Sequence, residues 1–219
     1  ISTAQITGLT GVDIGGLTST QFTALATNVL ASLTQTQLDN VNSGQISALT
    51  STAFRSLTST QLGSLVTSQI AAFSSTTFSA LTSSQLSGLA GTQLGALPTG
   101  TLNALSTNIF ANLTSSQIGG LRTTQVAALS TTAFGAFSST QISSFTTTQV
   151  QFIGTVNIAG LTTSQFSGFT STQLNVMHAT QMQALSTTLI AHLTTTQFSG
   201  FAAAGDITAL TTAQLNSLT

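Results

Sequence analysis

Apolar and polar residues recur along this chain with a strict period of eight, written L-S/T-x-x-Q-L-x-x. In steps of eight from Ile1, all 26 first positions are apolar, and so are all 25 sixth positions counted from Ile6. The frame is unbroken up to Phe201, and the segment AAAGD (202–206) then shifts it by one residue. A fixed short period over most of a chain indicates a repeat architecture.

The second and fifth positions of the octad carry residues that cap a helix N-terminus. Ser, Thr or Asn fills 18 of 26 second positions, and Gln fills 16 of 26 fifth positions. In a capping box the hydroxyl accepts from the backbone N–H three residues on, and the Gln side chain accepts from the N–H of the cap residue. The apolar first and sixth positions then fall at N′ and N4, where they form a hydrophobic staple. Each octad therefore predicts one helix of about seven residues, close to two turns.

These octads predict an all-α repeat solenoid of very short capped helices. Such short helices, rich in Ser and Thr, depend on packing against one another. The eighth position is Gly, Ala or Ser in 20 of 25 octads, which lets a neighbouring backbone come close. The alternative is a β-solenoid, because Thr, Val, Ile and Phe also favour strands. Apolar spacings of five and three would send successive side chains to opposite faces of one strand, unless each octad held a strand and a turn.

The octads that lack Gln indicate how many octads form one coil. Their fifth positions recur every 24 residues from Val29 to Thr101, and again from Ile109 to Asn157. This spacing predicts three octads per coil of 24 residues, whereas a two-octad coil would favour 16. Residues 1–219 then form a single continuous octapeptide-repeat solenoid. Because the sequence starts in repeat register without Met or a signal peptide, we expect a segment or processed product of a longer chain.

Composition excludes several classes of function. Charged residues make up 2% of the chain, against roughly 25% in ordinary globular proteins. Two Arg and no Lys cannot neutralise a phosphate backbone, so no nucleic-acid partner is expected. No run of about 18 apolar residues is present, so no transmembrane segment is expected. The absence of Cys excludes disulfides and thiolate metal ligands, and suits a secreted bacterial protein. The five charged residues are Asp13, Asp39, Arg55, Arg122 and Asp206.

No group of residues has a pattern typical of catalysis or of a bound cofactor. A nucleophile needs a base that is oriented by a third group, whereas the two His and three Asp occupy unrelated octad positions. His178 and His192 have no Cys or carboxylate nearby, which makes a poor zinc site. Asp13 stands in a glycine-rich first repeat, and the sequon at Asn112 arises readily by chance in a Thr-rich chain. We predict no catalytic residue, no cofactor site and no metal site, and a protein that is not an enzyme.

The octads LTSTQL, LTSSQL, LRTTQV and LTTTQF resemble the L-T-x-x-Q-L/I/V-x-x tracts of very large secreted or surface proteins of bacteria, often described as adhesin-like. The resemblance covers nearly the whole chain. It implies an extracellular or cell-surface location, and a role in surface fibres, stalks or adhesive layers that contact cell surfaces or polysaccharides.

Two classes of function follow. The first is a structural protein, the self-assembling subunit of an extracellular fibre, sheath or stalk. Ile1 and Leu218 lie in the apolar register, so neither end has a polar capping repeat, and open ends favour end-to-end association into filaments. The second is a module that binds ice or a polysaccharide through ranks of hydroxyls, because the third position is Ser or Thr in 21 of 26 octads.

Overall fold

The computed structural model describes residues 1–203 and 206–218. Over these residues the chain forms 26 α-helices and one 3₁₀ helix, η1, and no strand. The prediction of an all-α repeat solenoid is confirmed, and the β-solenoid alternative is wrong. Part of the AAAGD segment lies outside the described residues.

The chain divides into two compact units, Ile1–Asn112 and Leu113–Thr219. The helices of the first unit are α1 (Thr3–Ile6), α2 (Gly11–Gly16), α3 (Ser19–Thr23), α4 (Thr27–Leu30), α5 (Gln35–Leu38), α6 (Ser43–Ser47), α7 (Ser51–Ser56), α8 (Ser59–Ser64), α9 (Thr67–Ala71), α10 (Ser75–Phe78), α11 (Ser83–Leu86), α12 (Gly91–Ala96), α13 (Thr99–Asn103) and α14 (Thr107–Ala111).

The helices of the second unit are α15 (Ser115–Gly119), α16 (Thr123–Ala127), α17 (Thr131–Gly135), α18 (Ser139–Ile142), α19 (Thr147–Gln151), α20 (Thr155–Ala159), α21 (Thr163–Phe166), α22 (Ser171–Leu174), α23 (Ala179–Gln183), α24 (Thr187–Ala191), α25 (Thr195–Ala203), η1 (Asp206–Ala209) and α26 (Thr212–Leu215). Within the described residues, no helix has both the length and the hydropathy that crossing a lipid bilayer requires.

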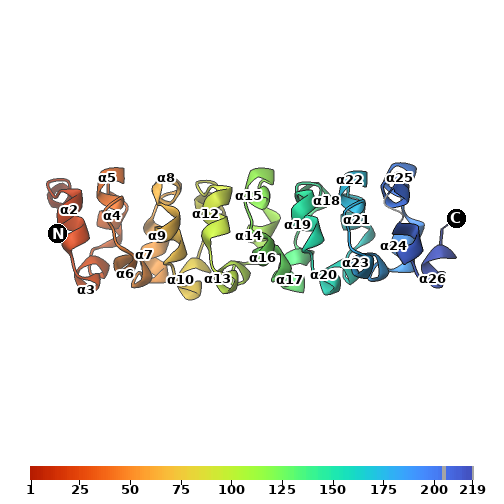
Figure 1. The fold of residues 1–219 in the computed structure, drawn as a ribbon. Coiled ribbons are helices and arrows are strands. Elements are labelled where there is room, and N and C mark those ends of the chain that lie inside the picture. The colour runs from red at the N-terminus through yellow and green to blue at the C-terminus, as the bar shows by residue number, and fades with distance from the viewer. Residues whose placement is uncertain (204–205, 219) are drawn as a thin grey trace. The chain divides into compact units, whose positions relative to one another are not determined.

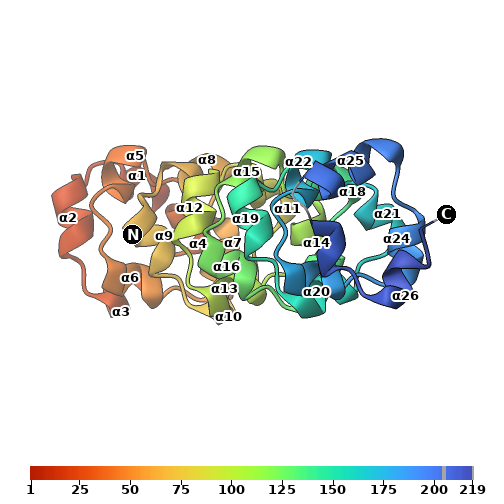
Figure 2. The same cartoon turned by 45° about the vertical axis from the view of Figure 1, so that its right-hand side comes forward.

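Within each unit, helices pack on the helix three places later in the chain. In the first unit α1 packs on α4, α2 on α5 and α3 on α6, and the series continues to α11 on α14. In Figures 1 and 2, α2, α5 and α8 accordingly follow one edge of this unit. The second unit repeats the arrangement, from α16 on α19 to α24 on α26. Three octads therefore form one coil, as the 24-residue spacing predicts.

The capping box forms as the sequence predicts, but the helices are shorter than expected. In α8, Thr58 Oγ1 accepts from Gln61 N at 3.1 Å, and Gln61 Oε1 accepts from Thr58 N at 2.9 Å. Most helices have four to six residues, where about seven were predicted. The helix ends early because the next first-position residue is already extended, as at Leu57 with φ −67° and ψ 135°. That residue must lead into the next N-cap, which is itself non-helical.

The core of each unit consists of the first and sixth positions, stacked layer on layer. Leu57, Leu62, Leu65 and Ile70 are at most 5% exposed, and their equivalents one coil later are also buried. Aromatic side chains fill some layers of the first unit: Phe54 lies 5.0 Å from Phe73 and 5.5 Å from Phe78 between ring centroids. The staple positions are thus the inward-facing side chains on all three sides of a coil.

Candidate assembly surfaces

Within each unit, a buried Gln joins a coil to the coil before it. In α11, the Nε2 atom of Gln85 donates to the carbonyl oxygens of Phe54 and Leu57, both at 2.9 Å. Its Oε1 atom accepts from the N-cap nitrogen of Thr82 at 3.1 Å. The side chain is 4% exposed. One amide therefore caps its own helix with its oxygen and holds the previous coil with its nitrogen.

The same contacts recur with fixed offsets in sequence. The amide nitrogen donates to carbonyls 31 and 28 residues earlier, which belong to a sixth and a first position. Glutamines with both contacts include Gln37, Gln45, Gln61, Gln69, Gln85 and Gln93 in the first unit and Gln149, Gln165, Gln173, Gln181 and Gln197 in the second. We call these residues the glutamine ladder.

The ladder tolerates two departures from the repeat. Beyond the AAAGD segment, Gln214 still donates to Met182 O and Leu185 O, at offsets of 32 and 29. The one-residue shift of the frame therefore does not break the hydrogen bonds between these coils. At two of the positions where Gln is replaced, a shorter polar side chain keeps part of the contact, whereas Val29, Ala53, Ile109, Ala133 and Leu189 have no side-chain donor. Thr77 Oγ1 donates to Leu49 O at 2.8 Å, and Asn157 Nδ2 donates to Leu129 O at 2.9 Å.

The first coil presents the donor half of this joint to solvent. Gln5 and Gln21 are exposed, unlike the buried ladder glutamines. Their Oε1 atoms accept from Ser2 N at 2.8 Å and Thr18 N at 2.9 Å, as in a capping box. Their Nε2 atoms meet no acceptor among the described residues. We call this surface the leading face and define it by Ile1, Gln5, Leu9, Leu17 and Gln21, whose apolar members are only partly covered.

On the third side of the leading face, Asp13 replaces Gln. Its Oδ2 atom accepts from Thr10 N at 2.8 Å and from Thr10 Oγ1 at 2.7 Å. These hydrogen bonds, the hydroxyl first, hold the pKa of the Asp13 carboxyl below its ordinary value. An ionised carboxylate only accepts hydrogen bonds. Asp13 therefore caps α2 but supplies no donor to the leading face.

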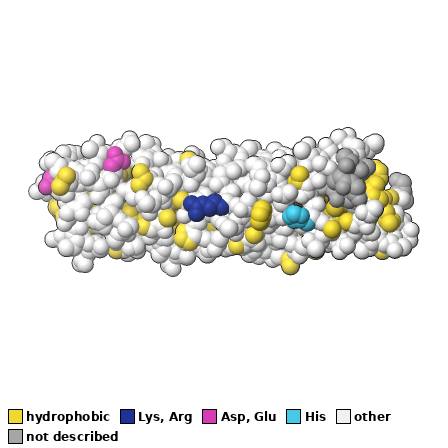
Figure 3. Space-filling model, in the orientation of Figure 1, with side chains coloured by type: hydrophobic (Ala, Val, Ile, Leu, Met, Phe, Trp, Pro, Cys, Tyr) yellow, Lys and Arg dark blue, Asp and Glu magenta, His cyan; other side chains and the backbone are white. Residues whose placement is uncertain are grey.

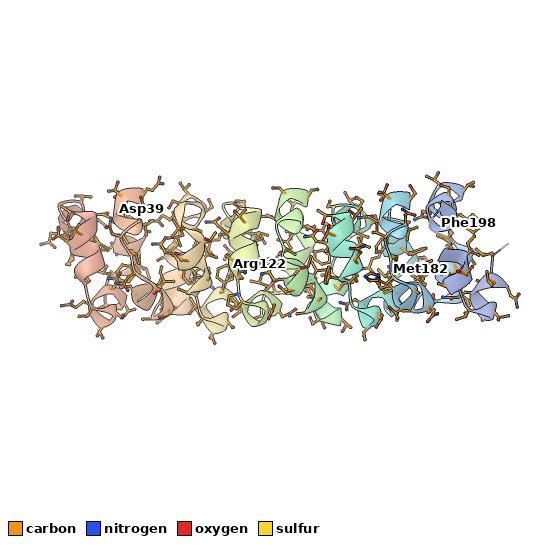
Figure 4. All side chains as sticks on the ribbon, in the orientation of Figure 1. Asp39, Arg122, Met182 and Phe198 are labelled. Carbon is orange, nitrogen blue, oxygen red and sulfur yellow. The ribbon has the colours of Figure 1, made fainter. Side chains whose placement is uncertain are left out.

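The last coil presents the acceptor half. An open cavity of about 300 Å³ is lined by Ile190, Ala191, Leu193, Thr195, Phe198 and Leu218. Hydrophobic side chains gather at this end of the second unit in Figure 3, and Figure 4 labels Phe198 there. No described donor reaches the carbonyl oxygens of Leu193 or Leu210, the acceptors that ladder glutamines fill elsewhere. We call this surface the trailing face and define it by Ile190, Leu193, Phe198, Leu210 and Leu218.

The residues considered as site candidates from sequence lie apart. His178 is the N-cap of α23, and His192 follows α24 with its Nδ1 atom 2.7 Å from Thr188 O. Asn112 donates to Asn108 O at 2.7 Å across the end of α14. Among the described residues, no three His, Cys, Asp or Glu side chains come close enough to hold a metal ion.

One side of the second unit carries an unbroken rank of hydroxyls. The first two residues of α16, α19, α22 and α25 are all Ser or Thr, and these helices pack on one another in sequence. Most of the surface in Figure 3 is neither hydrophobic nor charged, in keeping with this composition. The residues of the rank are Thr123, Thr124, Thr147, Thr148, Ser171, Thr172, Thr195 and Thr196.

Comparison with known proteins finds one repeat family. The model of the ALTTAQ repeat matches residues 40–75 and 94–131. These two stretches contain regular octads, including LRTTQV at residues 121–126, so the resemblance lies in the capped repeat itself. A search of curated proteins finds no match to the chain.

Proposed function

We propose that this chain is a structural protein, the self-assembling subunit of an extracellular bacterial fibre, sheath or stalk that is built by stacking of its repeats. The partner is the chain itself, with no catalytic step, cofactor or nucleic acid. The observation that carries the proposal is the contact that repeats between successive coils within each unit, where a buried glutamine caps its own helix and donates to carbonyl oxygens of the coil before it.

The contact between successive coils supports the proposal because it is made entirely by residues of the repeat. Each coil covers the apolar side chains of the coil before it and satisfies its carbonyls through the ladder. A surface of this kind fits another copy of itself in a head-to-tail manner. Heterologous contacts of that type build open filaments when their rotation does not close.

Low charge also supports the proposal. The net charge is −1 over 219 residues, so electrostatic repulsion between copies is slight. The resemblance to adhesin-like surface tracts agrees with an extracellular or cell-surface location. Contact with a cell surface or a polysaccharide is part of this proposal.

Electron microscopy of the purified chain, together with sedimentation velocity over a range of concentrations, tests the proposed function. Filaments or concentration-dependent oligomers are the expected result. A monodisperse monomer at every concentration would contradict it.

The hydroxyl rank on α16, α19, α22 and α25 favours a second candidate, a module that binds ice or a polysaccharide. Ser171 is the one residue of this rank that is not Thr, but Ser and Thr exchange freely at the third position over the chain as a whole, which argues against a precise lattice match. Thermal hysteresis or glycan binding by the monomer would support this candidate in place of the fibre subunit.

A further inference from the structure

We propose that the exposed side chains of Phe152 and Val156 in one copy of this chain dock in an open groove between α5 and α8 of a second copy. We call the pair Phe152 and Val156 the knob. This inference rests on the proposed structural function and adds a lateral contact to it, because the knob and the groove both lie on the sides of internal coils. Neighbouring stacks are then joined side by side, with their coils still stacked along the fibre axis.

The knob interrupts the repeat at two positions. The eighth position is Gly, Ala or Ser in 20 of 25 octads, and Phe152 is the only aromatic residue there. The fourth position is Ser or Thr in 18 of 25 octads, and Val156 replaces that hydroxyl. Phe152 is 47% exposed and Val156 is 69% exposed. The two residues flank the turn from α19 to α20, so large apolar side chains lie within five residues of each other on the surface.

The fold does not need these two side chains. The core beside them is complete, because Val150, Ile153 and Ile158 are at most 2% exposed. The helix α19 packs on α16 and α22, and α20 packs on α17 and α23, so the knob belongs to internal coils. Departures from a locally consistent pattern that bring no gain to the fold are typical of functional sites. The knob is therefore a contact surface.

The groove has the size and the lining that the knob requires. Its volume is about 220 Å³, whereas an apolar cavity of about 150 Å³ is enough to bind benzene. Leu33 and Leu38 supply apolar surface and are at most 4% exposed, and Thr58 and Thr60 add exposed hydroxyls. An apolar centre with polar surroundings is the usual composition of a protein–protein contact. The residues that line the groove include Ala31, Leu33, Leu38, Thr58, Thr60 and Ser64.

Charge favours a second copy of the chain as the partner. In the first unit two Asp and one Arg give a net charge of −1, whereas Arg122 is the only charged residue from 113 to 203. Asp39 follows Leu38 of the groove, and Arg122 is the N-cap residue of α16, which packs on the helix that ends at the knob. Figure 4 labels Asp39 and Arg122, and neither forms an ion pair among the described residues. Opposite charges beside the two surfaces steer knob to groove and disfavour groove to groove.

A contact of this kind extends without closing. The knob belongs to the second unit and the groove to the first, so each copy offers both halves. Heterologous contacts build open assemblies when their rotation does not close, and one apolar side chain that enters a pocket of the next molecule is enough to form them. Burial of the Phe152 ring is the main attraction. The contact therefore joins single stacks into sheets or bundles.

Disulfide trapping tests the pairing directly, because the chain has no Cys of its own. One preparation carries Val156→Cys and a second carries Thr60→Cys, and the two are mixed and treated with oxidised glutathione. The expected product is a dimer with one chain of each kind, identified from the masses of its disulfide-linked peptides. The matched control uses Val12→Cys in place of Val156→Cys, because Val12 is exposed but belongs to neither surface. It should give few mixed dimers.

Second changes in the two Cys-bearing chains measure what each surface contributes. Phe152→Ser, added to the Val156→Cys chain, restores a small residue, and Ala31→Leu, added to the Thr60→Cys chain, fills the groove. Each should lower the initial rate of mixed-disulfide formation about tenfold or more, with an unchanged unfolding temperature. Ala71→Leu is the control for added volume, because Ala71 occupies the same octad position as Ala31 and is also half-buried. That change should leave the rate unaltered.

Mixed dimers no more frequent than in the Val12→Cys control, or an unchanged rate with Phe152→Ser, would overturn the knob contact. Dimers formed mainly between two Val156→Cys chains would overturn it too, because they would show the knob in contact with itself. An unchanged rate together with loss of polysaccharide binding in the Phe152→Ser variant would assign the knob to a saccharide instead. Oligomers of the wild-type chain beside any of these results would leave the structural function standing. Absence of mixed dimers together with a monodisperse wild-type monomer would overturn both.

Discussion

The side-chain nitrogen of Gln85 lies 2.9 Å from the carbonyl oxygen of Leu57, 28 residues earlier in the sequence. The pair is buried, and it connects the start of one helix to the end of a helix in the previous coil. Because the other end of the same amide caps α11, local helix formation and coil stacking depend on one side chain. Neither can be lost without weakening the other.

Replacing Gln85 by Met should destabilise the first unit. The substitution keeps an unbranched side chain of similar length but leaves the buried carbonyl of Leu57 without its donor, at a cost of about 1 to 3 kcal/mol. The Phe54 carbonyl loses one of its two hydrogen bonds and keeps the one from Leu57 N at 3.1 Å. Chemical denaturation followed by circular dichroism measures the change. Gln21→Met is the matched control, because the Gln21 amide has a capping role but meets no earlier coil. Equal losses at the two positions would show that the Gln contributes only as a cap.

Asn157→Gln should stabilise the second unit by about 1 kcal/mol. Asn157 is 5% exposed, and its Oδ1 atom is buried without a hydrogen-bond partner. The longer side chain can accept from the N-cap nitrogen of Gly154 and still donate to Leu129 O, as the ladder glutamines do. The reverse substitution Gln173→Asn, in α22, should lose a similar amount. A destabilised Asn157→Gln variant would mean that the site has no room for the longer amide.

Gly88→Ala should destabilise the first unit by about 1 to 3 kcal/mol, the usual cost of overpacking. A Cβ atom at Gly88 would overlap the carbonyl oxygen of Ser59 in the previous coil. The control is Gly100→Ala in α13, where a Cβ atom meets nothing within 4 Å. That change should be neutral or stabilise by up to roughly 1 kcal/mol through helix propensity. Similar unfolding midpoints for the two variants would argue against close approach of the coils.

Asp13 should make stability depend on pH in the acid range. Hydrogen bonds from the Thr10 hydroxyl and backbone lower the pKa of its carboxyl below 3.8 in the folded chain. A depressed folded pKa means that the contribution is present above the unfolded pKa and is lost as pH falls through the folded pKa. Wild type should therefore lose stability relative to Asp13→Asn as the pH falls below about 4. Parallel pH profiles for the two proteins would contradict the assigned hydrogen bonds.

Much of the fold could be predicted from the sequence, because the octad encodes it locally. Thr58 and Gln61 form the expected capping box, and Leu57 and Leu62 form the expected buried staple. The three-octad coil could also be predicted, since octads without Gln recur every 24 residues. Helix length was overestimated because the first position of each octad leaves the helix to lead into the next cap.

The ladder could not be predicted from the octad alone. A capping box explains the oxygen of Gln61 but assigns no partner to its nitrogen, and the acceptors, Leu30 O and Leu33 O, lie 31 and 28 residues earlier. Residues so far apart in the sequence come into contact only when three octads have folded into a coil that stacks on the coil before it. The substitutions give a partial signal: Thr77 and Asn157 at fifth positions retain a side-chain donor, whereas the apolar residues at other fifth positions, such as Ala53 and Leu189, do not.

X-ray fibre diffraction from aligned assemblies tests the central claim, that the chain assembles by continuing its own coil stacking. The account predicts a reflection at about 8 to 10 Å, the separation of packed helices, directed along the fibre axis. The same reflection at right angles to the axis would show side-by-side association. A reflection at about 4.7 Å along the axis would show cross-β structure and contradict helical stacking altogether.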